Sequence, residues 1–273
     1  MSYEEIAKDA RKKVLELIYK AQSSHIGSNF SCIDIMTVLF EKMDLKKDIF
    51  VLSAGWKAAS LYYFMWKKGM ITEDELNSYC MPGSKWIGLS EPVHPFIKFA
   101  GGSMGLGLPA AVGFALSKKL KGEDGTIYCL MSDGEMAIGT TWESALMASH
   151  HKLDNLTVII DYNGFQATGK TNEVLNIEPL AGKWRAFGFW VAEIDGHTYE
   201  EIDLASRIVL DKPMVLIAKT TKGKGVSFME NNNYWHYLAP SEEEYNKATE
   251  ELEKHLPPSL CVPPSLSGGG DGG

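Results

Sequence analysis

The feature that most constrains the fold is an alternation of short apolar runs with amphipathic stretches in the second half of the chain. The apolar runs cover residues 126–131, 156–161, 189–194 and 214–219, and stretches with helical spacing lie at 141–151, 178–187 and 198–210. A strand that is apolar along its whole length is buried on both faces, as in a parallel sheet. Strands of this kind separated by helices predict an α/β fold, with a mostly parallel sheet and helices on both faces.

The first half of the chain adds further elements. Apolar residues recur at helical spacing over residues 1–22, and turn-forming residues follow. A second helix is expected over residues 31–42 with Ser31 as its N-cap, and a buried strand over 49–52 leads into another helix. Residues 81–104 are rich in glycine, proline and serine, which predicts a long loop. We expect one domain over residues 1–256 and a disordered Pro/Ser/Gly-rich tail over residues 257–273.

The composition argues against several classes of function. Lys and Arg number 27 against 35 Asp and Glu, whereas nucleic-acid binders and proteins of anionic membranes concentrate basic charge. No apolar run approaches the roughly 20 residues that span a bilayer, and the first residues lack the pattern of a signal peptide. The 4 cysteines form no CxxC pair, so neither a zinc site nor a disulfide framework is expected. A cytoplasmic protein that binds neither nucleic acid nor a membrane is the resulting prediction.

Polar residues follow two of the predicted strands. Asp133 and Gly134 come after the first strand, and Asn163 and Phe165 come after the next, with Asn163 lying 30 positions beyond Asp133. Parallel strands end at one edge of a sheet, so these residues should lie side by side. The two side chains and the Phe165 carbonyl would be oxygen ligands for Mg²⁺ with positions left for a diphosphate, which the backbone at Gly134 could approach. Either segment alone is better explained as a turn, but their joint placement favours a metal–diphosphate site.

Several separate blocks of the sequence resemble the transketolase family, in the family's order and over most of residues 5–255. The two polar turns are similar to the diphosphate signature of thiamine-diphosphate enzymes. Ser24-His25-Ile26-Gly27 is similar to the family's S-G-H-P-G segment, and residues 101–107 are similar to its glycine-rich loop. The remaining blocks are 152–156, 161–164, 184–188, 195–197, 219–226 and the segment that ends at Trp235-His236.

The resemblance implies a thiamine-diphosphate-binding fold that holds thiamine diphosphate and Mg²⁺. The reaction would be transfer of a two-carbon ketol unit from a ketose to an aldose. The sequence stops where the first domain of a full-length transketolase would end, so it resembles the N-terminal subunit of a split transketolase. A second subunit with the pyrimidine-binding and C-terminal domains would complete the site, in an α2β2 assembly.

The resemblance also implies roles for individual residues. The metal ligands would be Asp133, Asn163 and the Phe165 carbonyl. The residues that contact thiamine diphosphate would be Gly102, Ser103, Met104, Asp133, Gly134, Glu135, Asn163, Phe165 and His236. The catalytic histidines would be His25, His94 and His236, which would donate hydrogen bonds or move protons at the ketose. A single histidine is more often structural, and the block around His94 is the shortest of those matched.

The sequence departs from the family at three points. Trp56 stands where the family's S-x-G-H segment has histidine, which removes an acid–base group and adds bulk. Ser132 replaces the first glycine of G-D-G, and Ile138 replaces a carboxylate that normally joins a network across the subunit interface. We therefore expect a modified or non-standard ketose donor.

Three other interpretations are possible from the sequence. The chain could be an assembly subunit that binds the cofactor without turnover. It could also be the alpha subunit of another thiamine-diphosphate enzyme, such as a 2-oxo acid dehydrogenase, although residues 184–188 and 222–226 favour transketolase. A G-x-G-x-x-A pattern at residues 105–110 imitates a nicotinamide-binding motif, but no clear strand precedes it. The Lys/Gly run at 219–224 lacks P-loop spacing and is interpreted as a solvated turn.

Overall fold

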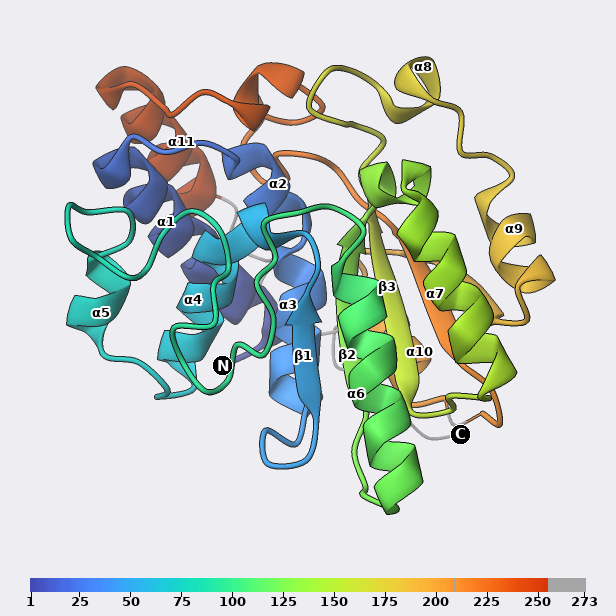
Figure 1. The fold of residues 1–273 in the computed structure, drawn as a ribbon. Coiled ribbons are helices and arrows are strands. Elements are labelled where there is room, and N and C mark those ends of the chain that lie inside the picture. The colour runs from blue at the N-terminus through green and yellow to red at the C-terminus, as the bar shows by residue number, and fades with distance from the viewer. Residues whose placement is uncertain (209, 255–273) are drawn as a thin grey trace, which may run out of the picture.

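The computed structural model describes residues 1–208 and 210–254, in which helices lie on both sides of a five-stranded sheet (Figure 1). The strands are β1 (Ile49–Leu52), β2 (Ile127–Ser132), β3 (Leu156–Tyr162), β4 (Trp190–Asp195) and β5 (Met214–Lys219). They lie in the order β1-β2-β3-β5-β4, and each neighbouring pair is parallel. The predicted α/β fold is therefore confirmed.

Two layers of helices cover the sheet. The helices are α1 (Tyr3–Ala21), α2 (Ile26–Ser31), α3 (Ile33–Lys42), α4 (Ala58–Lys67), α5 (Glu73–Asn77), α6 (Gly107–Lys121), α7 (Gly139–His150), α8 (Thr171–Val174), α9 (Leu180–Ala186), α10 (Tyr199–Ser206) and α11 (Glu242–Lys254), with short 3-10 turns η1 (Gly55–Lys57), η2 (Asp133–Ala137) and η3 (Asn233–His236). Helices α6, α7 and α9 cover one face, and α3, α4 and α10 lie on the other (Figure 1). Helix α1 packs against α3, α4 and α11 behind that second layer.

The central strands are buried on both faces, as their uninterrupted apolar runs predict. In β3, Val158 and Ile160 belong to the hydrophobic core under α6, α7 and α9, while Ile159 between them belongs to the core on the opposite face. The register places Ser132 of β2 opposite Asp161 of β3. The residues that follow these two strands therefore leave the sheet side by side at its carboxyl edge.

The beginning of the second predicted helix differs from the expectation. Ser31 is not an N-cap, because it is the last residue of α2, and α3 begins at Ile33 without a side-chain cap. The single O–H of Ser31 instead has two acceptors within reach, the Ser28 carbonyl (3.0 Å) and Asp161 Oδ2 (2.5 Å). Helix α2 occupies part of the segment that was expected to form a turn. The turn is confined to its start, where the N-cap residue His25 has the left-handed conformation at φ 73°.

Two further expectations concern the limits of the chain. The predicted tail at residues 257–273 lies outside the described residues, and the domain boundary at residue 256 stays a prediction. Within residues 1–208 and 210–254, no helix combines the length and apolar character needed to cross a membrane.

Candidate active site

A cavity of 370 Å³ lies at the carboxyl edge of the sheet. Its walls come from the start of α2, from η1, from the glycine-rich loop before α6, from η2, from the loop after β3 and from η3. Ligands of open α/β sheets bind beyond the carboxyl ends of the strands, where loops with free side chains converge. The cavity is therefore the candidate site, and it brings together residues from both ends of the chain.

Asp133 lies between two residues that line the cavity, Ser132 and Gly134, and is itself completely buried. Its Oδ1 accepts from Gly134 N (2.9 Å), and its Oδ2 accepts from Gly164 N (2.9 Å) and from Thr171 Oγ1 (2.8 Å). Burial raises the pKa of Asp133 to about 6, although these hydrogen bonds act in the opposite direction. Among the described residues, the buried Lys57 pairs with Asp161 rather than with Asp133. The Asp133 carboxylate is thus a buried acid whose charge a bound cation would balance.

Asn163 and Phe165 place two further oxygen atoms near this carboxylate. The amide Nδ2 of Asn163 donates to Asp161 Oδ2 (3.4 Å), an atom that can only accept, so the orientation of the amide is defined. Its Oδ1 accepts from Phe165 N (3.1 Å) and keeps a lone pair. Phe165 forms a β-bridge with Lys170 whose two hydrogen bonds use the neighbouring residues, which leaves the Phe165 carbonyl out of the bridge. Carboxylate, amide and carbonyl oxygens are ligands suited to Mg²⁺.

Gln166 has an unused donor at the cavity wall. Its Nε2 is buried and has no hydrogen-bond partner among the described residues, a state that costs free energy unless a ligand or water accepts from it. The side chain lies over Gly134, where an added Cβ would approach Gln166 Cγ to 3.4 Å. Gly134 lines the cavity as expected, but its N–H is bonded to Asp133 and is not free for a phosphate.

Glu135 supports the site from behind, since it does not line the cavity. Its carboxylate accepts from Ser53 Oγ, Ser132 N (2.8 Å) and Gly105 N (3.1 Å), and burial raises its pKa. These bonds join the ends of β1 and β2 to the glycine-rich loop. Gly102 and Met104 of that loop line the cavity, whereas Ser103 is exposed and does not.

The glycine-rich loop lies directly on the end of β1. Gly55 N donates to Gly101 O (2.9 Å), and a Cβ on Gly101 would come within 2.5 Å of the Leu52 carbonyl oxygen. Only glycine permits this approach of two backbones.

Lys57 and Asp161 form an ion pair under the cavity, and both side chains are fully buried. Asp161 also accepts from Ser31 and Thr220 hydroxyls, so it joins α2, η1, the end of β3 and the loop after β5. Burial alone would raise the pKa of Asp161, but the Lys57 ammonium and the hydroxyls of Ser31 and Thr220 together lower it.

His25 and His236 both line the cavity and form one part of its wall. The backbone N–H of His25 donates to the backbone carbonyl of His236 (2.9 Å). The two imidazole rings meet edge to face, with their centroids 4.8 Å apart. Burial, followed by the nearby Lys222 ammonium, lowers the pKa of His25 to about 4 and that of His236 to about 3. Both rings are therefore neutral at neutral pH. The Trp56 and His25 ring centroids are 6.5 Å apart, and Trp56 lines the cavity together with the glycine-rich loop.

The third histidine is not brought to this wall. His94 lies outside the cavity, 6.4 Å from the Trp86 ring centroid, and its Nδ1 accepts from Phe96 N (3.1 Å). Its position is that of a residue that stabilises a turn of the long loop.

Sequence reasoning missed three residues of the site. Lys57, Gln166 and Lys222 were not singled out, and Lys222 was included in a run interpreted as a solvated turn. That interpretation is wrong for Lys222, which is fully buried, whereas Lys219 and Lys224 are exposed at their side chains. Its place in a block similar to the family's was the signal that could have found it.

Comparison with known proteins decides the family. Residues 2–266 match the family model described as transketolase, thiamine diphosphate binding domain. The chain belongs to the transketolase family. A relative from Phocaeicola vulgatus, named as one of the subunits of an apulose-4-phosphate transketolase, is 36% identical over 90% of this chain and 92% of its own length. The 6-deoxy-6-sulfo-D-fructose transketolase subunit SqwG of a Clostridium species is 35% identical over 89% of this chain and 94% of its own length.

The same family is found among solved structures. The transketolase of Campylobacter jejuni superposes with a TM-score of 0.88 at 32% identity, and the match covers 93% of this chain but 43% of that one. A transketolase can thus contain this fold as one part of a longer chain, while relatives named as subunits have nearly the length of this chain. The predictions of a thiamine-diphosphate-binding domain and of an N-terminal transketolase subunit are confirmed.

Proposed function

We propose that the cavity binds Mg²⁺ and the diphosphate of thiamine diphosphate, and that the chain, with a second subunit, transfers a two-carbon ketol unit from a ketose to an aldose. The observation that supports this most directly is the arrangement of the cavity. Asn163, Phe165 and the two neutral histidines line it. Asp133, a buried carboxylate that forms no ion pair with the described residues, lies between two of the lining residues.

The residues present fit both groups. Mg²⁺ would take Asp133, Asn163 and the Phe165 carbonyl as ligands and would neutralise the buried carboxylate. The free Nε2 of Gln166 would donate to a phosphate oxygen. Among the described residues, no group of three or more His, Cys, Asp or Glu side chains is placed to hold a metal ion. The proposed site uses one carboxylate together with an amide and a carbonyl oxygen.

Thiamine diphosphate would supply the carbanion chemistry, and this chain would supply binding and polar groups. His25 and His236 are close enough to act on one substrate, since their ring centroids are 4.8 Å apart. Both rings are neutral, so each carries one N–H, and an N–H that faces the substrate would stabilise oxygen atoms that gain negative charge during the reaction. Trp56 carries an indole donor and no basic nitrogen, so it would shape the donor site without moving a proton.

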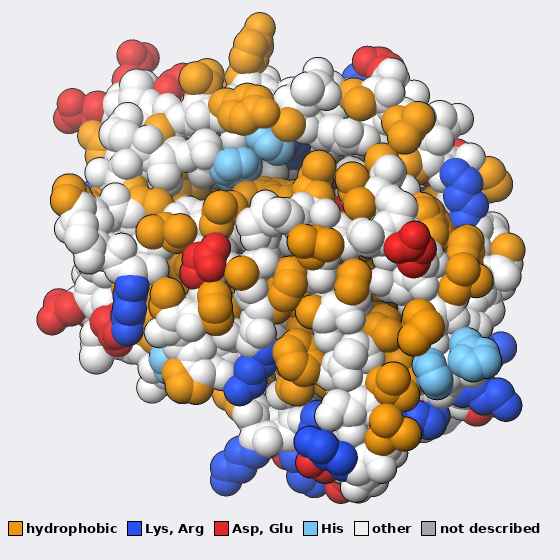
Figure 2. Space-filling view, in the orientation of Figure 1, with side chains coloured by type: hydrophobic (Ala, Val, Ile, Leu, Met, Phe, Trp, Pro, Cys, Tyr) orange, Lys and Arg blue, Asp and Glu red, His pale blue; other side chains and the backbone are white. Residues whose placement is uncertain are grey.

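An exposed apolar surface supports the second subunit. Leu146 and Met147 of α7 are 59% and 47% exposed, and Met104 and Leu106 before α6 are 46% and 43% exposed. Figure 2 shows hydrophobic side chains gathered over the face that carries α6 and α7. A contiguous apolar surface of this kind is typical of an interface. We place the subunit with the pyrimidine-binding and C-terminal domains on it, in an α2β2 assembly, and the cytoplasmic location stays a prediction.

The proposal predicts ketol transfer by this chain only when it is combined with that subunit, thiamine diphosphate and Mg²⁺. Phosphorylated, unphosphorylated and modified ketoses would be offered with an aldose, and the transferred product would be measured. Cofactor binding with no transfer from any donor would instead support an assembly subunit. Oxidative decarboxylation of a 2-oxo acid without ketol transfer would favour the dehydrogenase interpretation.

Trp56 predicts a non-standard donor preference. Two relatives are named for apulose-4-phosphate and 6-deoxy-6-sulfo-D-fructose, and we propose a ketose of such modified classes for this chain. The Trp56→His variant is expected to change the ratio of kcat/KM between modified and standard donors by about 10-fold or more, because it frees volume and adds a basic nitrogen beside His25. Trp66→His, at the half-buried end of α4 away from the cavity, is the control. An unchanged ratio in Trp56→His would exclude this role.

A further inference from the structure

We propose that Lys222 fixes the tautomer of His236, so that Nε2 of His236 carries the ring proton and faces the cavity as a hydrogen-bond donor. Lys222 itself does not line the cavity. It would act through His236 and is therefore a positioning residue.

The hydrogen bonds that lead to His236 have a defined direction because they start from a group that can only accept. The Ala167 carbonyl accepts from Asn233 Nδ2 (3.1 Å), which leaves Asn233 Oδ1 to accept from Lys222 Nζ (2.6 Å). Lys222 Nζ also lies 3.0 Å from His236 Nδ1. An amine that is either charged or neutral has at least two N–H groups, so it can donate to both partners.

The protonation of the other ring nitrogen of His236, Nε2, follows from this hydrogen bond. His236 is neutral at neutral pH, since burial lowers its pKa to about 3, and a neutral imidazole carries one N–H. If Nδ1 accepts from Lys222, the proton is on Nε2. Among the described residues Nε2 has no hydrogen-bond partner, and His236 lines the cavity. Its N–H is therefore available to a ligand.

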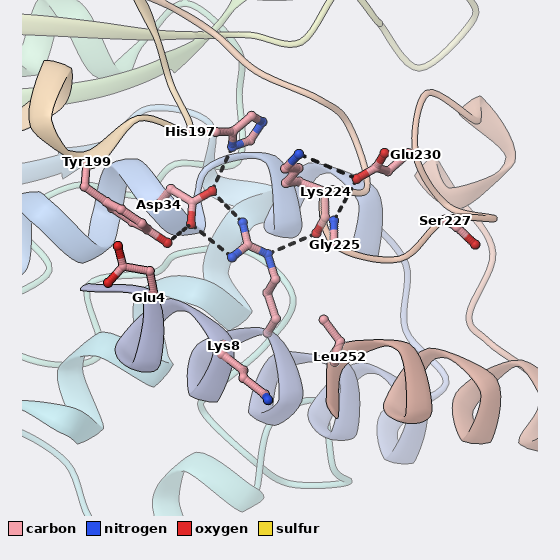
Figure 3. Close-up of a pocket in the computed structure, with 11 residues that line it drawn as sticks. Glu4, Lys8, Asp34, His197, Tyr199, Lys224, Gly225, Ser227, Glu230 and Leu252 are labelled. Atoms are coloured by element: carbon pink, nitrogen blue, oxygen red, sulfur yellow. Dashed lines mark hydrogen bonds and ion pairs between the residues drawn. The ribbon is translucent and has the colours of Figure 1, made fainter. Parts of the chain in front are cut away.

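A buried cluster outside the cavity holds the loop on both sides of Lys222 (Figure 3). On one side, Thr221 N donates to His197 Nε2 (2.8 Å). On the other side, Arg11 Nε donates to the Lys224 carbonyl (3.0 Å). Two fixed points so close to residue 222 leave its backbone little freedom.

Asp34 joins these two anchors. It accepts from both terminal nitrogens of Arg11 (3.0 and 2.6 Å), from His197 Nδ1 (2.7 Å) and from the Tyr199 hydroxyl (2.9 Å). Because His197 Nε2 accepts from a backbone N–H, its Nδ1 is the nitrogen that donates to Asp34. A separate cavity of 520 Å³ lies beside this cluster. The cluster's polar groups are satisfied within the chain, so its role is to hold the loop.

The consequence for catalysis rests on the proposed function, whereas the tautomer does not. An Nε2–H of His236 held toward the cavity would stabilise negative charge on a substrate oxygen without having to reorient. The opposite tautomer would present a lone pair to that oxygen and repel it.

Nitrogen-15 NMR of the full chain with labelled histidine tests the tautomer directly. The His236 signals, assigned by their loss in His236→Gln, are expected to show a protonated Nε2 and an unprotonated Nδ1 at neutral pH. A protonated Nδ1 in the unchanged protein would overturn the proposal, and this measurement needs no partner, cofactor or activity.

Variants then test the cause. Lys222→Met keeps the length of the side chain but removes its donors, and we expect His236 to show a mixture of tautomers or a protonated Nδ1. His197→Leu removes the acceptor of Thr221 N and is expected to shift the same signals in the same direction, by a smaller amount. Lys224→Met, on a side chain that is 39% exposed, is the matched control and should leave them unchanged. A His236 spectrum that is the same in Lys222→Met as in the unchanged protein would refute the role of Lys222.

The assembled enzyme provides the second readout. Lys222→Met is expected to lower kcat by about 10- to 100-fold with a smaller change in KM, because it alters a hydrogen bond that strengthens as charge develops. A tautomer shift together with unchanged kcat would leave the assignment of the proton intact and would instead exclude the proposed catalytic use of His236.

Discussion

Replacing Lys57 with methionine is expected to lower the free energy of unfolding by about 3–5 kcal/mol, measured by urea denaturation at neutral pH. The substitution leaves the Asp161 carboxylate fully buried without its cation, while Ser31, Asn163 and Thr220 still donate to it. Hydrogen bonds alone do not compensate for the desolvation of a charge. The same loss should move the end of β3, so cofactor affinity would fall with stability.

Two further measurements separate this explanation from a simple loss of packing. The stability difference between Lys57→Met and the unchanged chain should shrink as pH falls, because the Asp161 pKa rises without Lys57 and a protonated Asp161 needs no counter-charge. Lys68→Met, at the other end of α4, removes a partly exposed pair with Glu41 and should cost less than about 1 kcal/mol. An equal cost for both variants would contradict a buried-charge effect.

The Asp133→Asn variant is expected to weaken Mg²⁺-dependent binding of thiamine diphosphate by at least about 100-fold, measured by calorimetry on the assembled enzyme. An amide keeps the size of the side chain but removes the negative charge that we assign to the metal. The two carboxylate oxygens of Asp133 accept from Gly134 N and Gly164 N. In the variant, the amide nitrogen would replace one of these oxygens, so that a donor would face another donor.

The matched control is Asp154→Asn, which alters an exposed carboxylate paired with Lys119. Circular dichroism would establish that both variants fold, so that a binding loss reports on the site. Cofactor affinity in Asp133→Asn equal to that of the unchanged enzyme would remove Asp133 from the metal ligands and, with it, the proposed centre.

The sheet was predictable because each of its strands is a short apolar run that can be recognised from neighbouring residues alone. An apolar run such as 156–161 between two helical stretches has few alternatives in a chain of this length, and the structure places it at the centre of a parallel sheet. Helix α2 was not predictable in the same way. It has no side-chain cap, and its entry residue His25 takes a positive φ that cap and turn rules do not anticipate.

Burial of the two lysines was beyond local reasoning for a different reason. Lys57 and Lys222 are charged residues, and such residues are rarely fully buried unless they are paired. Their partners Asp161 and Asn233 are 104 and 11 positions away. The contacts form only when the ends of β1 and β3, and the segments that follow β5, meet at one edge of the sheet. His94 is a different case, because this histidine of a short matched block does not line the cavity of the isolated chain, and its predicted catalytic role stays a prediction.

The backbone hydrogen bond from His25 N to His236 O joins residues that are 211 positions apart. During synthesis on the ribosome, strands β1 to β3 and the polar turns that follow β2 and β3 therefore emerge well before His236. Closing so long a loop has an entropic cost that must be met before its contacts form, so this contact is expected to be a late event of folding. A nascent chain would therefore form the two polar turns before the contact between the two histidines closes this part of the cavity.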